Sequence, residues 1–335
     1  MHKGKYVFSQ LLDFLDRNDF NYLARKYGGD KYVKQFTCYN QLCVLMFGQL
    51  SNRESLRDVI LATQAHASKA YHLGFGKHAA KSTLADANTK RDYRIFEEFA
   101  YKVIAEAQRC RIVDIFKLNG NIYAFDSTTV DLCLSTFEWA LFRKKKGGIK
   151  MHTLYNLETQ IPTFFHITPA KVHDTKAMYV IPYEENSFYI FDRGYNDFKR
   201  LHNIESIGAY FVIRGKTNND FKPMKWKRRF PTGSGIHSDA VGYMAGQLTM
   251  EQHLKIKKFC GSSENAVRIQ IYSAIIAYCM MTIVQKKMNI ERSIYEMLQI
   301  VSILLTDATL LKDLFAKPNY NIVNELNGST ESTLF

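Results

Sequence analysis

The chain has 335 residues, of which 46% are hydrophobic and 6 are prolines, a composition that excludes a disordered protein and is long enough for two domains. Lysine and arginine together number 45 against 32 acidic residues, a formal net charge of +13. This excess makes a polyanion such as nucleic acid the first partner to consider, although a generally basic, solvated surface would give the same number.

The cysteines and the apolar stretches indicate a cytosolic protein. No two of the 6 cysteines form a Cys-x-x-Cys pair, so we expect reduced core residues and neither a zinc ribbon nor a thioredoxin-type motif. The N-terminus lacks the apolar run of a signal peptide. The most apolar stretch, 269–284, is shorter than the roughly 20 residues that span a bilayer. We therefore predict a buried core helix there and no membrane association.

Residues 1–115 are predicted to form a helical N-terminal domain, because apolar residues recur at helical spacing. The expected helices are 7–27, 38–50, 55–66, 82–91 and 92–111, with Ser51 and Glu54 forming a capping box before the third.

The pair of helices at 55–66 and 82–91 is typical of a helix-turn-helix that reads DNA. Lysines and an arginine that are available to phosphates flank the second helix: Lys77, Lys81, Lys90 and Arg91. An ordinary helical bundle with exposed lysines explains the same pattern, since short helix pairs are common.

Residues 116–335 are predicted to form a mixed α/β domain. Runs of β-branched and aromatic residues predict strands at 121–134, 148–157, 161–170, 187–192 and 209–216, and helical spacing predicts helices at 171–183 and 197–208. This order favours a mixed sheet flanked by helices. Residues 217–251, rich in glycine and basic side chains, are expected to be irregular or disrupted, and helices resume after them.

Two aspartates follow apolar strands in the same way. Asp126 comes after Tyr123-Ala124-Phe125, and Asp192 closes the strand of "YIFDRGYNDF". In a sheet of this order the first and fourth strands lie side by side and parallel, and ligands collect beyond the carboxyl ends of parallel strands. Two carboxylates so close raise each other's pKa unless a cation compensates, and Mg²⁺ prefers such oxygens. Two ions of this kind promote phosphoryl transfer on a nucleic-acid backbone.

Each of these aspartates also has a structural interpretation, as a helix N-cap or a turn residue. Two other aspartates nearby, Asp131 and Asp174, are expected to be structural, the second because it starts a helix. The histidines of the region match no metal-binding spacing and are expected to be core or hydrogen-bonding residues: His152, His166 and His173.

The motifs together resemble a known family. "AFDSTTVDLCLSTF", "KGGIKMHTLYN", "HITPAKVHDTKAM" and "YIFDRGYNDF" look like the core of a bacterial insertion-sequence DDE transposase of the insertion-sequence-four group, whose catalytic domain is RNase H-like. The first 51 residues resemble that group's helical N-terminal domain, and the tail from QHLKIKKF resembles its C-terminal helices.

The resemblance implies cut-and-paste DNA transposition by a bacterial, cytoplasmic, nucleoid-associated enzyme. Such enzymes bind double-stranded DNA, both the inverted-repeat ends of the element and the target, and usually act as homodimers. Three acids hold two Mg²⁺ ions, for which Mn²⁺ substitutes. Asp126 carries over as the first acid and Asp192 as the second, as catalytic residues and metal ligands.

The third acid is where the sequence departs from the family. The family places a glutamate on a late helix in the pattern Tyr-(2)-Arg-(3)-Glu-(6)-Lys. Counting back from Glu251 puts that position on Met244, and a count from Tyr243 to Lys257 puts it on Met250. The departure indicates an internal deletion before the C-terminal helices. The alternatives are therefore a catalytically impaired copy that only binds DNA, and an unrelated metal-dependent nuclease of RNase H-like fold.

Overall fold

A computed structural model gives the structure of the chain. It describes residues 4–53, 55–76, 79–110, 116, 118–132, 141–143, 146–214, 220–226, 240–245 and 263–316. The chain divides into two compact units, the first made of Met1–Cys110 with Ser263–Phe335 and the second of Arg111–Ser262. The predicted domains were 1–115 and 116–335. In the structure the C-terminal helices instead belong to the same unit as the N-terminal helices.

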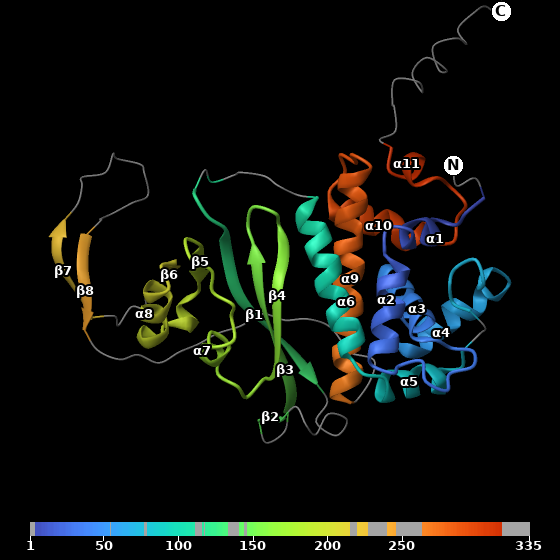
Figure 1. Cartoon of the computed structure of the whole chain (residues 1–335), viewed down its shortest axis with the longest axis horizontal. Helices are drawn as coiled ribbons and strands as arrows, with labels where there is room; N and C mark the ends of the chain where they lie inside the picture. Colours follow the sequence, from blue (N-terminus) through green and yellow to red (C-terminus); the bar gives the residue numbers. More distant parts are fainter. Residues whose placement is uncertain are drawn as a thin grey trace, which may run out of the picture. The chain divides into compact units, whose positions relative to one another are not determined.

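Helix α9, Glu264–Lys287, explains this grouping because it forms the core of the first unit. It packs against α6 (Arg94–Arg109), α3 (Cys38–Leu50) and α5 (Lys81–Lys90), and Figure 1 shows α6 and α9 side by side. By length and composition α9 is apolar enough to cross a membrane, but 78% of its most apolar window is buried inside the protein. The prediction of a buried core helix is confirmed.

The other helices of this unit are shorter than the sequence suggested. They are α1 Val7–Leu12, α2 Arg17–Lys26, α4 Leu56–Ala65, α10 Ile294–Leu304 and α11 Leu311–Leu314, with a 3₁₀ turn, η1, at Ala67–Lys69. The helix expected at 7–27 is two helices, because the Asp16 side chain accepts from the amides of Asn18 and Asp19 and starts α2. Ser55, not Ser51, caps α4, and its hydroxyl accepts from the Asp58 amide.

The helix-turn-helix prediction does not match the structure. Helices α4 and α5 are separated by residues 66–80, whereas that motif joins its helices by a turn of about 3–4 residues. Arg91 is buried and donates to Gln41 Oε1 at 2.9 Å and to the carbonyl of Phe36. Lys90 pairs with Asp86, and Lys77 lies outside the described residues. The pair is part of a helical bundle.

The second unit contains a mixed sheet made of the five predicted strands and of one short strand, at 141–143, that was not predicted. They are β1 Ile122–Leu132, β2 Leu141–Arg143, β3 Lys146–Asn156, β4 Ile161–Pro169, β5 Phe188–Phe191 and β6 Tyr210–Ile213. The order is β2-β3-β1-β5-β6, with β4 pairing to β3 (Figure 1). Strand β3 is antiparallel to β1 and β4, whereas β1, β5 and β6 are parallel. The prediction of a mixed α/β fold is confirmed.

One face of this sheet carries an aromatic core. Tyr123 and Phe125 of β1 and Tyr189 and Phe191 of β5 alternate along their strands and are buried in one cluster. The same cluster includes residues of α7 (Asp174–Ala177), of α8 (Phe198–Ser206) and of the 3₁₀ turn η3 (Arg193–Tyr195). The helix expected at 171–183 is reduced to the four residues of α7, because its apolar residues reach the core from a loop.

Part of the range 217–251, which was expected to be irregular, forms strands, and the rest of it lies outside the described residues. Strands β7 (Asp220–Trp226) and β8 (Ala240–Ala245) form a two-stranded antiparallel sheet. The register of the hairpin shifts between Pro223 and Lys225, and such an irregularity is where a strand tolerates proline.

Gly120, just before β1, has a backbone conformation that other residues rarely adopt, because its φ is +141°. A Cβ added there would overlap the Asn186 carbonyl oxygen. We expect Gly120→Ala to lower the free energy of unfolding by about 1–3 kcal/mol, measured by chemical denaturation. Gly194→Ala is the control, because no atom lies within 4 Å of its added Cβ. Equal stability of the two variants would contradict this account.

Candidate active site

Asp126 and Asp192 lie where two parallel strands separate. Phe125 of β1 pairs with Phe191 of β5, the last pair of their ladder, and neighbouring strands are about 4.8 Å apart. Asp126 and Asp192 follow this pair, and both are exposed. Beyond it β1 continues to Leu132 alongside β3, whereas the chain after Asp192 turns into η3. The prediction that the two strands are parallel neighbours is confirmed, and both aspartates lie at the same end of the β1–β5 ladder.

The carboxylate of Asp126 is electrostatically perturbed. Partial desolvation raises its pKa, and the nearby charges of Asp192 and Asp174 raise the pKa further, whereas the Ser127 amide lowers it by donating to Asp126 Oδ1 at 2.7 Å. Two neighbouring carboxylates favour protonation of one of them or the binding of a cation. The charge of Asp192 therefore acts on the Asp126 carboxylate, as the sequence predicted.

Tyr195 fills the space behind the two aspartates. Its ring packs on Phe125 at 5.2 Å and on Phe191 at 5.9 Å between centroids, and its amide donates to the Asp192 carbonyl at 3.0 Å. Burial raises the pKa of its hydroxyl, and the side chain of Ser127 opposes that rise. Tyr195 was not among the predicted site residues, although "YIFDRGYNDF" contains it.

A buried ion pair lies on the core face of β1. Lys150 Nζ is 3.0 Å from Asp174 Oδ1, and both side chains are nearly buried. Ser127 Oγ donates to the same oxygen at 3.0 Å, and Lys150 Nζ donates to the Val172 carbonyl at 3.1 Å. Asp174 begins α7, as expected, but its pairing with Lys150 was not predicted. An inward lysine on a strand was the signal that could have shown it.

The histidines occupy core and hydrogen-bonding positions, as expected. His152 is fully buried beside Phe125 and His166, with ring centroids 6.1 and 6.0 Å away, and its Nε2 is 3.1 Å from Thr168 Oγ1. His173 Nδ1 is 2.7 Å from Thr175 Oγ1. Among the described residues, no group of three or more His, Cys, Asp or Glu side chains is arranged to hold a metal.

The position of the third acid lies largely outside the described residues. Met244 belongs to strand β8, not to a helix like that on which the family carries its glutamate. Met250, Glu251 and Lys257 fall in 246–262, which the structure does not describe.

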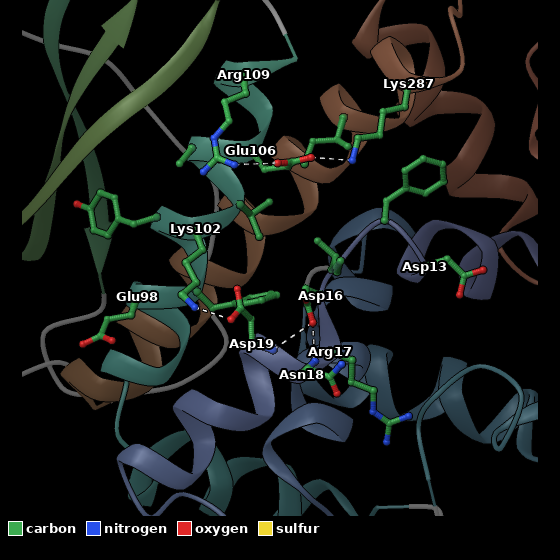
Figure 2. A pocket seen from close by; sticks show the side chains of 17 residues that line it. Asp13, Asp16, Arg17, Asn18, Asp19, Glu98, Lys102, Glu106, Arg109 and Lys287 are labelled. Carbon is green, nitrogen blue, oxygen red and sulfur yellow. Dashed lines mark hydrogen bonds and ion pairs between the residues drawn. The ribbon is translucent and has the colours of Figure 1, made fainter.

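The first unit holds a separate cavity of about 1330 Å³ that is lined by residues of α2, α6 and α9 (Figure 2). Several of its charged side chains pair with one another. Lys102 pairs with Asp19 at 2.6 Å, and Lys287 pairs with Glu106 at 2.7 Å, as the dashed lines of Figure 2 show. A cavity with compensated charges gives no sign of a charged ligand, so the candidate site remains at the aspartates.

Comparison with known proteins gives two family matches. Residues 3–76 match the family described as "Domain of unknown function (DUF4372)", and residues 118–238 match the "Transposase DDE domain". The second range includes both Asp126 and Asp192. Together the two matches support an insertion-sequence DDE transposase.

Individual relatives agree with this family. A Sinorhizobium fredii protein named as a transposase, y4zB, is 26% identical over 65% of this chain and 75% of its own length. A Synechocystis protein named as a transposase for the insertion sequence element IS4SA is 26% identical over 59% of this chain and 69% of its own. Among solved structures, a piggyBac transposase synaptic complex with hairpin DNA has a TM-score of 0.41 at 9% identity, covering 99% of this chain and 86% of that one. That similarity is too weak to identify the fold.

His152 makes the second unit sensitive to acid. Desolvation lowers its pKa to about 4, against 6.5 for a free histidine, so the stability gained by keeping the ring neutral is present above pH 6.5 and is lost as the pH falls toward 4. Between pH 7 and pH 5 we expect this group to account for about 2 kcal/mol of lost stability. Urea denaturation at both pH values measures it in wild type and His152→Gln. An equal loss in both proteins would contradict the assignment.

Proposed function

We propose that this chain is a transposase that binds the ends of its insertion sequence and catalyses Mg²⁺-dependent DNA cleavage and strand transfer. The observation that carries the proposal is the position of Asp126 and Asp192 directly after Phe125 and Phe191, the last pair of the β1–β5 ladder. The protein would act in the bacterial cytoplasm at the nucleoid, as a homodimer on paired ends.

The sheet topology supports the proposal. Strands β4, β3 and β1 form an antiparallel group, and β5 and β6 extend it in parallel beside β1. This is the arrangement expected of the RNase H-like core that the family resemblance implies. It creates a point beside β1 where the connections leave in opposite directions, which is where ligands bind in open α/β sheets.

The two carboxylates fit a hard divalent cation. Both are exposed, both provide oxygen ligands, and the charge of Asp192 acts on Asp126, which a cation would offset. We propose Asp126 and Asp192 as the metal ligands and Mg²⁺ as the ion, with Mn²⁺ as a substitute. When bound, such an ion lowers the pKa of the attacking water or 3′-hydroxyl and stabilises the leaving oxygen. The protein's part is to hold the two carboxylates at one strand edge and to orient the DNA.

Two exposed arginines beside the aspartates suit DNA phosphates. Arg193 follows Asp192 directly, and the amide of Arg214, after the end of β6, donates to the Phe191 carbonyl at 3.3 Å. Neither guanidinium forms an ion pair within the part of the chain that the structure describes. Arginine binds phosphate through a planar fork of donors. A DNA strand across this edge would therefore be held next to the carboxylates.

The family match, the relatives and the geometry at Asp126 and Asp192 give no support to the alternative of a chain that only binds DNA. Glu251 directly follows Met250, one of the two positions that the family pattern marks.

We expect Asp126→Asn and Asp192→Asn to lower cleavage of a DNA fragment carrying the element's ends on the order of 100-fold or more, because each removes a charge that binds the cation. The assay measures the cleavage rate in Mn²⁺ and in Mg²⁺. Asp197→Asn, a helix-cap variant on α8, is the control, and Glu251→Gln tests the third acid in the same assay. Wild-type cleavage by Asp126→Asn would contradict the proposed function.

Replacing Arg193 and Arg214 by glutamine should weaken DNA binding and leave the fold intact. Each lost phosphate contact makes the fall of log affinity with log salt concentration less steep by about 1. Fluorescence anisotropy at several salt concentrations measures this slope. Lys312→Gln on α11 is the matched control for the loss of one charge. If the double variant and the control gave the same slope, these arginines would not contact phosphate.

A further inference from the structure

Ser127 joins Asp126 to the buried ion pair on the core face of the sheet. Successive side chains of a strand point to opposite faces, so Asp126 and Ser127 of β1 lie on different faces. The Ser127 amide donates to Asp126 Oδ1 at 2.7 Å, and its hydroxyl donates to Asp174 Oδ1 at 3.0 Å. One residue therefore contacts the proposed metal ligand on one side and a buried carboxylate on the other.

The Ser127 amide is free for this contact because β5 has ended. Along β1, the Asn121 carbonyl accepts from Phe188 of β5, whereas the Ile122 carbonyl accepts from Leu157 on the other side. Alternation then directs the Ser127 amide toward β5. The ladder with β5 stops at Phe191, so this donor binds the Asp126 carboxylate in place of a strand.

Asp174 is held firmly enough to fix the Ser127 hydroxyl. Its Oδ1 accepts from Lys150 Nζ at 3.0 Å, and the same ammonium donates to the Val172 carbonyl two residues before Asp174. Asp174 and Lys150 are 8% and 9% exposed. Separating the partners of a buried charge pair strongly destabilises the protein. Asp174 is therefore held in its position beside Lys150.

We propose that Asp174, acting through Ser127, is a positioning residue that sets the orientation of the Asp126 carboxylate for a divalent cation. The inference rests on the proposed function, because it takes Asp126 as a metal ligand. The ordered contacts are Lys150 to Asp174, Asp174 to Ser127, and Ser127 to Asp126. Residues that orient a metal ligand in this way typically change metal affinity about 10–100-fold when they are replaced.

The test measures the dissociation constant of Mn²⁺ for the full chain without DNA, by isothermal titration calorimetry. We expect Ser127→Ala and Asp174→Asn to raise this constant about 10–100-fold, and Ser127→Thr, which keeps the hydroxyl, to restore binding to within about 3-fold of wild type. Thr175→Ala is the control, because Thr175 lies in the same short helix as Asp174 and its hydroxyl contacts His173. Circular dichroism melting of each variant reports its fold.

The double variant Lys150→Met with Asp174→Leu covers the case in which Asp174→Asn unfolds. Apolar replacement of both partners of a buried pair preserves folding in many proteins, and we expect this folded protein to bind Mn²⁺ as weakly as Ser127→Ala.

Asp126→Asn separates the two proposals. Loss of Mn²⁺ binding in Asp126→Asn together with wild-type binding by folded Ser127→Ala would overturn the positioning role and leave the proposed function standing. Wild-type binding by both variants would overturn both.

Discussion

The parallel pairing of β1 with β5, and its end after Phe125 and Phe191, is the constraint on which the proposed site depends. While the strands are paired, their alternate aromatic residues are committed to the core. Beyond the last pair, the next residue of each chain segment has no partner in the β1–β5 ladder and is open to solvent. Both of these residues are aspartates. The site therefore follows from where one short ladder stops.

The aromatic cluster under the sheet keeps this point of separation in place. Tyr195 lies against the last paired residues, Phe125 and Phe191, and its amide closes the turn on the Asp192 carbonyl. Edge contacts between rings contribute about 0.5–1.5 kcal/mol each beyond the area that they bury. The apolar face and the polar edge are thus parts of one arrangement, since the same strands supply both.

Much of the second unit was predictable from the sequence. Runs such as Tyr123-Ala124-Phe125 and Phe188–Phe191 mark strands by their residue types, and the order of strands and helices is enough to place β1 beside β5. The side-chain contacts that orient Asp126 were not predictable, because Lys150 and Asp174 are 24 residues apart in sequence and meet only after β3, β4 and α7 have folded back. The role of Arg91 was misjudged for a similar reason: charge suggested exposure, but Gln41 and Phe36 bind the guanidinium inside the bundle.

The domain division shows the same limit. The apolar helix α9 was expected to be buried, but its sequence pattern does not identify the helices against which it packs, which are α6 and α3 of the first unit.

The central claim is that Asp126 and Asp192 share a cation. A crystal grown with Mn²⁺ and measured for anomalous scattering tests it most directly. The account predicts an anomalous peak with oxygen atoms of both carboxylates about 2.0–2.6 Å away, the distances of hard divalent cations. A peak bound to neither aspartate, or to only one of them, would contradict it.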